Sequence, residues 1–97
     1  MIKVNYNDKA IKISGHANFD AYGKDIVCAS VSSIVYTTVN GILNVNKNSI
    51  KFNDEKDLII EILTNDLIVN KLIKSMLDLL KELEKQYPKN IKISKGE

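Results

Sequence analysis

The sequence predicts an α+β fold, a two-layer sandwich in which two helices pack on a mostly antiparallel sheet in the order ββαββα(β). Two pairs of short segments have the patterns of strands, since apolar residues alternate in three of them and fill most of the fourth, and a turn separates the members of each pair. A longer segment with helical spacing follows each pair. Two hairpins that are each followed by a helix favour a two-layer sandwich over a doubly wound parallel sheet. The 97 residues fit one domain, residues 1–97.

The first predicted hairpin comprises residues 2–6 and residues 10–14, in which apolar and polar side chains alternate with a period of two. Residues 7–9, Asn-Asp-Lys, supply the turn between these two strands. Residues 15–24 follow with two glycines, an Asn and an Asp, and without regular apolar spacing. This segment is therefore expected to be a loop.

The first helix is predicted to start at Asp25 and to end before residues 44–48. The carboxylate of Asp25 can accept hydrogen bonds from the amides of the first turn, as N-cap residues do. The apolar residues that follow recur at helical spacing around well over half of the circumference, and none of the side chains is charged. Because it lacks a charged face, we expect this helix to be buried on more than one side. A second subunit is a candidate for the second cover.

The second hairpin is predicted from a short strand at residues 50–52, a turn at residues 53–56 and a mostly apolar strand at residues 58–63. The second helix is expected over residues 66–86, with Asp66 as its cap and Pro88 as its stop. The predicted inward-facing residues of this helix are Leu72, Ile73, Met76, Leu77, Leu80 and Leu83. After Pro88 the alternation resumes, which permits a last short strand.

The composition argues against direct binding of nucleic acid. A net charge of +2 is too weak for a duplex-binding surface. All 14 basic residues are lysine, so the guanidinium fork that suits phosphate and guanine edges is missing. With no Trp, two Phe and four Tyr, the chain offers few surfaces on which bases could stack.

The single cysteine excludes an intrachain disulfide and a multi-cysteine metal site, and it fits a reducing compartment. The first residues lack the apolar core of a secretory signal. Residues 26–46 are uncharged and resemble a membrane span, but they include eight Ser, Thr and Asn side chains, too many for lipid. We therefore expect a cytoplasmic protein that does not enter the membrane.

The chemistry is expected at the one histidine and the one cysteine, which lie 12 residues apart at the two ends of the predicted loop. Cys28 falls in the first turn of the first helix, where the amides and the macrodipole favour thiolate over thiol. The same amides can hydrogen-bond an oxyanion at a carbonyl under attack. A loop that folds back would bring His16 against Cys28 as a nucleophile–base pair.

The spacing alone leaves other interpretations open. A single cysteine in an apolar helix is more often a small core residue, and a single histidine is more often only hydrogen-bonded. A metal site of His16, Cys28 and Asp25 would have only three ligands, and Asp25 serves better as a cap, so we expect no metal. Ser32 lies one turn after Cys28 and either orients the site or satisfies a backbone carbonyl.

The residues around this pair resemble a known family. The string Gly15-His16-Ala17 is followed by Gly23-x-Asp25-Ile26-Val27-Cys28-Ala29-x-Val31-Ser32 and by Val39-Asn40-Gly41-Ile42. Over residues 15–43 the sequence resembles the ribosomal-processing cysteine protease (Prp) family, and the ββαββα order agrees with that family across most of the chain.

The resemblance implies an endopeptidase with a Cys/His dyad that works as a homodimer. Nothing in the residues points to a nucleotide, flavin or metal enzyme, so we expect no cofactor. Carried over by position, Cys28 is the nucleophile and His16 is the general base and then the general acid. Asp25 and Ser32 are supporting residues. The implied substrate is the N-terminal extension of bacterial large-subunit ribosomal protein twenty-seven, cut after an apolar or aromatic stretch and before a small residue.

An aromatic-lined groove would suit such a substrate. Phe19 and Tyr22, together with Gly15, are the substrate-binding residues that we predict in the loop. Two rival classes share part of this pattern. A non-catalytic, ribosome-associated binding module would have the same fold with Cys28 in its core, and another thiol-dependent acyl hydrolase would share the reactive cysteine.

Overall fold

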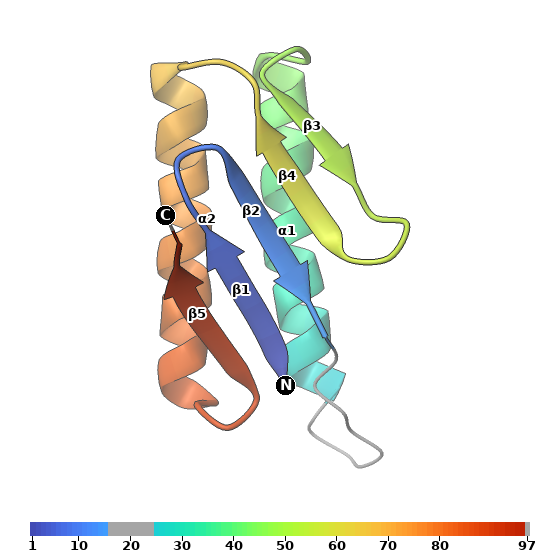
Figure 1. Cartoon of the computed structure of the whole chain (residues 1–97), viewed down its shortest axis with the longest axis vertical. Helices are drawn as coiled ribbons and strands as arrows, with labels where there is room; N and C mark the ends of the chain where they lie inside the picture. Colours follow the sequence, from blue (N-terminus) through green and yellow to red (C-terminus); the bar gives the residue numbers. More distant parts are fainter. Residues whose placement is uncertain (16–24, 97) are drawn as a thin grey trace.

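The computed structural model describes residues 1–15 and 25–96, with only the backbone of Asp25, and Figure 1 shows the path of the chain. The described elements follow the predicted order strand, strand, helix, strand, strand, helix, strand. Their bounds are β1 Ile2–Tyr6, β2 Ala10–Ser14, α1 Asp25–Val45, β3 Ile50–Asn53, β4 Leu58–Ile62, α2 Leu67–Gln86 and β5 Ile91–Lys95.

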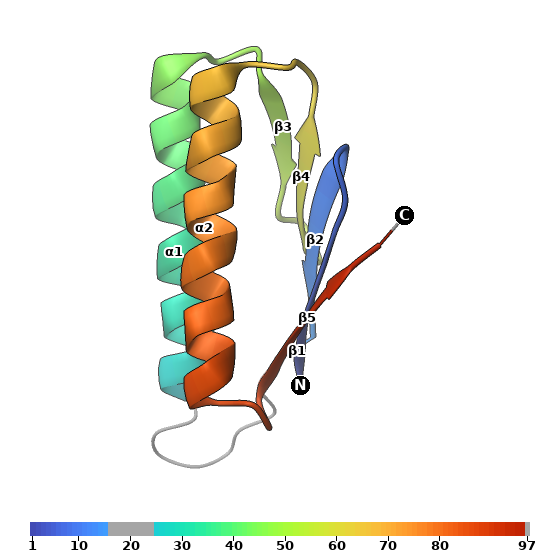
Figure 2. The same cartoon turned by 90° about the vertical axis from the view of Figure 1, so that its left-hand side faces the viewer.

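The described strands form a five-stranded sheet in the order β3-β4-β2-β1-β5. β1 pairs antiparallel with β2, β2 with β4, and β4 with β3, whereas β5 pairs parallel with β1. Both helices lie on the same face of this sheet (Figure 2). The predicted two-layer α+β sandwich is therefore confirmed, and the segment after Pro88 does form a strand.

The hydrophobic core lies between the two layers. Alternation directs every second side chain of the strands toward the helices, and Val4, Ile11 and Ile60 are completely buried there. The buried helix residues are Val27, Val31, Val35, Val39 and Ile42 of α1 and Val69, Ile73, Met76, Leu77, Leu80 and Leu83 of α2. The predicted inward face of α2 is confirmed, with Leu72 half-buried at its margin and Val69 as a further member.

The ends of α2 lie where the sequence predicts them. Asp66 is the N-cap, and its carboxylate accepts hydrogen bonds from the backbone N–H groups of Ile68 at 2.9 Å and Val69 at 3.1 Å. The bond from Val69, more than any other contact, holds the pKa of Asp66 below its ordinary value. The helix ends two residues before Pro88, because the residue before a proline disfavours helical geometry.

Within the single chain, α1 is covered on one side. Its valine row is buried, but its opposite face is open in this chain, where Ile26 is 48% exposed and Ser33 and Thr37 are exposed as well. Among the described residues, α1 is also the one helix that is long and apolar enough to cross a membrane, a test that the core helix of a soluble protein passes as well. Burial of a second side of α1 by another subunit stays a prediction.

Candidate active site

Cys28 is the fourth residue of α1 and lies in its first turn. Its side chain is half-buried and packs against the hydrophobic core. A position in the first turn is close to the positive end of the helix macrodipole, which stabilises a negative charge. The sulfur of Cys28 is therefore partly accessible and lies where a helix favours an anion.

The chain leaves β2 through Gly15, whose φ is +82°. Residues that have a side chain rarely adopt this left-handed backbone conformation. A Cβ at this position would also overlap with the carbonyl oxygen of Met1. Glycine thus allows the end of β2 to pass close to the start of β1. Gly15 therefore has a role in the backbone path. Its predicted contact with the substrate stays a prediction.

The structure covers the other predicted site residues only in part. Outside the described residues lie His16, Phe19, Tyr22 and the side chain of Asp25. The histidine–cysteine pair, the N-cap of α1 and the aromatic groove in the loop therefore stay predictions. Ser32 is described, and it is exposed one turn after Cys28 on the same side of α1.

Two turns beyond Cys28, the same side of α1 carries an aromatic cluster that the sequence interpretation missed. Tyr36 packs edge-on against Phe52 of β3, with ring centroids 5.5 Å apart and an interplanar angle of 87°. Its hydroxyl donates a 2.8 Å hydrogen bond to the carboxylate of Asp54, which raises the pKa of Tyr36 above its ordinary value. Cys28, Ser32 and Tyr36 follow one another at a spacing of four residues. This spacing could have revealed that they share one side of the helix.

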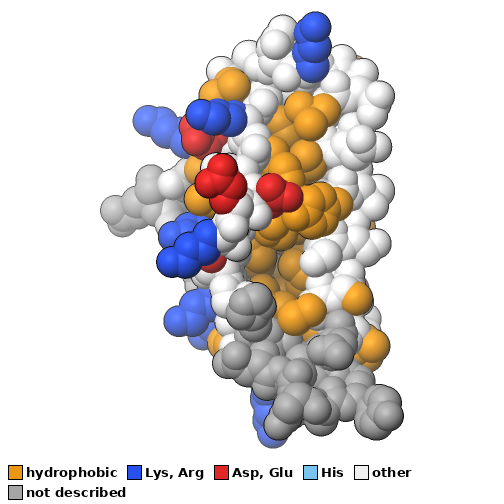
Figure 3. All heavy atoms as spheres, turned by 90° about the vertical axis from the view of Figure 1, so that its right-hand side faces the viewer, with side chains coloured by type: hydrophobic (Ala, Val, Ile, Leu, Met, Phe, Trp, Pro, Cys, Tyr) orange, Lys and Arg blue, Asp and Glu red, His pale blue; other side chains and the backbone are white. Residues whose placement is uncertain are grey.

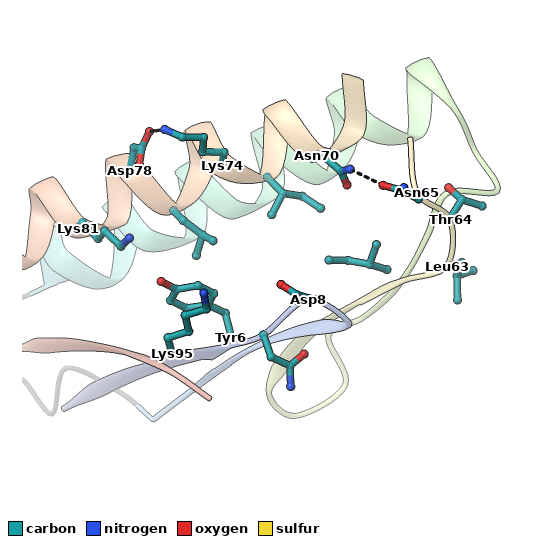
Figure 4. Close-up of a pocket in the computed structure, with 14 residues that line it drawn as sticks. Tyr6, Asp8, Leu63, Thr64, Asn65, Asn70, Lys74, Asp78, Lys81 and Lys95 are labelled. Carbon is teal, nitrogen blue, oxygen red and sulfur yellow. Dashed lines mark hydrogen bonds and ion pairs between the residues drawn. The ribbon is translucent and has the colours of Figure 1, made fainter. Parts of the chain in front are cut away.

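A cavity of about 730 Å³ lies between α2, the β1–β2 turn and the segment that joins β4 to α2 (Figure 4). Its lining mixes apolar and charged groups. Lys81 Nζ lies 5.5 Å from the ring centroid of Tyr6, and Lys74 pairs with Asp78 at 2.8 Å. None of its described lining residues is a cysteine or a histidine, and none belongs to α1. Within residues 1–15 and 26–96, no group of three His, Cys, Asp or Glu side chains could hold a metal ion.

Comparisons with known proteins place this fold, with its cysteine at a helix N-terminus, in the class of the cysteine proteases. Within this class, the model of the family described as the cysteine protease Prp matches residues 1–92. The chain belongs to this family. The resemblance seen around His16 and Cys28 is therefore confirmed.

One curated relative and two solved structures show how far the likeness extends. The chain is 28% identical over 101 residues to the ribosomal processing cysteine protease Prp of Staphylococcus aureus (strain Mu50). The alignment covers 96% of this chain and 95% of the relative. A crystal structure of the essential ribosomal processing protease Prp from S. aureus with a covalently linked product peptide has a TM-score of 0.83 and 26% identity, and covers 98% of this chain and 97% of that one. A second structure of that protein, with a substrate peptide, has the same TM-score and coverage at 25% identity.

Proposed function

We propose that this protein is an endopeptidase that removes the N-terminal extension of bacterial large-subunit ribosomal protein twenty-seven, with a Cys28/His16 dyad. The observation that carries the proposal is the half-buried position of Cys28 in the first turn of α1, in a chain of the Prp family. The S. aureus relative binds a substrate peptide and a covalently linked product peptide, which supports a peptide as the partner of this chain.

The first half of the reaction joins Cys28 to the substrate. The Sγ thiolate attacks the carbonyl carbon of the scissile bond, and N–H groups of the first turn of α1 stabilise the oxyanion. One donor of this kind typically lowers the barrier by about 3–4 kcal/mol. When the C–N bond breaks, His16 donates a proton to the leaving amine, and the acyl part stays on Cys28 as a thioester.

The second half of the reaction releases the acyl part. His16 takes a proton from a water molecule, whose oxygen attacks the thioester carbonyl. The C–S bond then breaks, the carboxylic acid product leaves, and the Cys28 thiolate is restored beside the protonated imidazole. Asp25 supports the pair by capping the helix or by orienting the imidazole, and Ser32 supports it from the next turn of α1.

The loop supplies part of the substrate site in this proposal. Phe19 and Tyr22 bind the apolar or aromatic stretch that precedes the cleavage point, and Gly15 contributes at the start of the loop. Residues 1–97 act as one protease domain in the cytoplasm, without a cofactor and without contact to nucleic acid or membrane.

A second copy of the chain is the proposed cover for the outer face of α1. This face exposes Ile26, Ser33 and Thr37, and no charged side chain follows Asp25 along the helix. A surface without charges can be buried without the free-energy penalty of desolvating them. A two-fold homodimer brings the same surface of both copies together, so one uncharged face is sufficient.

The test is mass spectrometry of a peptide that spans the N-terminal extension, after incubation with the purified protein. We expect one cleavage position with the wild-type protein and none with Cys28→Ala, whose thermal unfolding should be nearly unchanged. Rapid alkylation of Cys28 at neutral pH without cleavage would instead indicate another thiol-dependent acyl hydrolase. Alkylation only after unfolding would indicate a non-catalytic binding module. Cleavage by Cys28→Ala at the wild-type rate would contradict the proposal.

A further inference from the structure

An apolar strip follows the side of α1 that meets β3. We define this apolar strip as Cys28, Tyr36 and Leu43 of α1 with Phe52 of β3. Tyr36 follows Cys28 by eight residues and Leu43 follows Tyr36 by seven, so the three lie on one side of the helix. Tyr36 and Leu43 are 42% and 38% exposed. On the face that carries β3 and α1, Figure 3 shows hydrophobic side chains gathered in a band between charged and uncharged polar surface.

Tyr36 is fixed in this strip by contacts within the chain. Its ring packs edge-on against Phe52, and its hydroxyl is bound to the carboxylate of Asp54 at 2.8 Å. A side chain whose rotamer is already fixed loses little conformational entropy when a ligand packs on it. A large aromatic ring that stays exposed in such a position is therefore a preorganised contact surface.

The neighbouring strand suits an extended chain as the occupant. β3 is an edge strand that pairs with β4, and among the described strands it has no partner on its outer edge. The backbone N–H and C=O groups of such an edge can hydrogen-bond an extended peptide, while alternate side chains of that peptide enter an apolar surface beside it. The chemistry that fits the strip is thus an extended peptide segment with apolar side chains.

We propose that the apolar strip binds the substrate on the N-terminal side of the scissile bond, with Tyr36 and Phe52 as a subsite for one apolar side chain. This inference rests on the proposed role of Cys28. The acyl part of the substrate is bonded to Cys28 between the two halves of the reaction. Contacts along the strip therefore hold the acyl part in place during both halves. Cys28 and Tyr36 are about 12 Å apart along the helix at 1.5 Å per residue. An extended chain covers this distance in three to four residues, at about 3.3 Å each.

The experiment combines a peptide series with three protein variants. In the peptides, each of the five residues before the scissile bond is changed in turn to Asp. In the protein, Tyr36→Ala removes the ring and Tyr36→Phe removes only the hydroxyl. Leu79→Ala is the matched control, because Leu79 is a similarly exposed apolar residue of α2, at 52%. Cleavage is measured as kcat/KM, and peptide binding is measured separately in the Cys28→Ala background, where no cleavage is expected.

We expect Tyr36→Ala to lower kcat/KM and to weaken peptide binding about tenfold, the effect of losing one good aromatic contact. The Tyr36→Ala defect should disappear with the peptide that carries Asp at the third or fourth position before the bond. Tyr36→Phe should stay within about threefold of the wild type because its ring keeps the contact area. Leu79→Ala should equal the wild type. The alkylation rate of Cys28 should be the same in all three variants.

The proposal is wrong if Tyr36→Ala binds and cleaves every peptide as the wild type does. It is also wrong if the size of the Tyr36→Ala defect depends on the peptide residues after the scissile bond. It is also wrong if Tyr36→Ala separates a dimer into monomers while peptide binding stays unchanged, because the strip would then be an interface between two copies. Tyr36-dependent binding of peptides that are never cleaved would support the strip and count against the proposed function alone.

Discussion

The two helices pack on the same face of the sheet, but their outer surfaces differ. α2 exposes charged side chains, and some of them pair along the helix, as Lys74 with Asp78 at 2.8 Å and Lys85 with Glu82 at 3.7 Å. α1 exposes Ile26, Tyr36 and a series of Ser, Thr and Asn residues, with no charge after Asp25. A charged outer face is typical of a helix that borders water. The surface of α2 therefore suits solvent, whereas the surface of α1 suits a partner.

This difference separates residues that hold the fold from residues to which we assign a function by proposal. Most of the sequence of α2 is explained by its buried stripe, its N-cap and its charged outer residues, and the exceptions are the exposed Leu67, Ile68 and Leu79. The exposed residues of α1 are not explained by the packing of one chain. Cys28 lies at the start of that helix, Tyr36 lies further along the same side, and Thr37 lies on the open face. Our proposals assign these three places to catalysis, substrate binding and a second subunit.

The largest effect is expected at the catalytic end of α1. His16→Ala removes the proposed base and should lower the cleavage rate by about 10²- to 10⁴-fold, the usual contribution of general acid–base catalysis. It should also slow alkylation of Cys28 at neutral pH, because no imidazolium remains to stabilise the thiolate. Both rates are measured against Ser75→Ala, an exposed change on α2 that should alter neither. Unchanged cleavage by His16→Ala would remove the histidine from the mechanism.

The next effect is expected at Gly15, where a side chain would be strained at φ +82° and would overlap with the carbonyl oxygen of Met1. Gly15→Ala should lower the free energy of unfolding by about 1–3 kcal/mol. Cleavage should fall further than this loss explains, because His16 follows directly. Denaturant unfolding and cleavage kinetics measure the two effects. Gly41→Ala is the control, since its Cβ would meet no atom within 4 Å and helical Ala is favourable. A Gly15→Ala protein as stable as the wild type would contradict this role.

Most of the fold could be predicted because period and burial are directly linked. Alternation located β1, β2 and β3, a mostly apolar segment located β4, and Asp66 and Pro88 marked the limits of α2. The order of the strands could not be predicted. β5 lies beside β1 in a parallel pair, with Ile91 opposite Ile2, and no local pattern specifies which edge of the sheet the last segment joins.

The candidate site was also predicted only in part, because local patterns do not show which distant segments come together. The first-turn position of Cys28 follows from the start of an apolar helix and from the family motif. The cluster of Tyr36, Phe52 and Asp54 was missed because its members are 16 and 18 residues apart in the chain. Helical spacing shows that Tyr36 shares a side with Cys28, but only the tertiary structure shows that this side meets β3. The close approach of Gly15 to Met1 is a tertiary feature as well.

A smaller effect is expected for subunit association. Thr37→Lys places a charge on the open face of α1, and burying an unpaired lysine against a second copy is unfavourable. The dimer dissociation constant should rise at least about tenfold. Leu79→Lys places the same charge on the solvated face of α2 and should leave association unchanged. Size-exclusion chromatography with light scattering measures both. A Thr37→Lys dimer as tight as the wild-type dimer would place the interface on another surface.

The smallest effect is expected at the N-terminus of α2. Asp66→Ala removes the acceptor for the N–H groups of Val69 and Ile68 and should lower the midpoint of thermal unfolding by a few degrees at neutral pH. The pKa of Asp66 is lowered from 3.8 in the folded state, chiefly by the bond from Val69. Its stabilising contribution is therefore complete above the unfolded pKa and is lost as the pH falls through the folded pKa. The difference between Asp66→Ala and the wild type should shrink in acid, below about pH 4.

Asp66→Asn separates the hydrogen bonds of the cap from its charge. Asn is as good an N-cap as Asp, so this variant should keep most of the stability at neutral pH and lose the dependence on acid. Cleavage should be unchanged in both variants, because Asp66 is far from Cys28. The Asn46 side chain donates a 3.4 Å hydrogen bond to Asp66, and Asn46 follows the last residue of α1, whereas Cys28 lies in the first turn of that helix. Thermal unfolding between pH 3 and 7 and cleavage at neutral pH measure the two properties. A slower cleavage by the folded Asp66→Ala protein would show that α2 also contributes to the site, and the division of roles between the helices would be wrong.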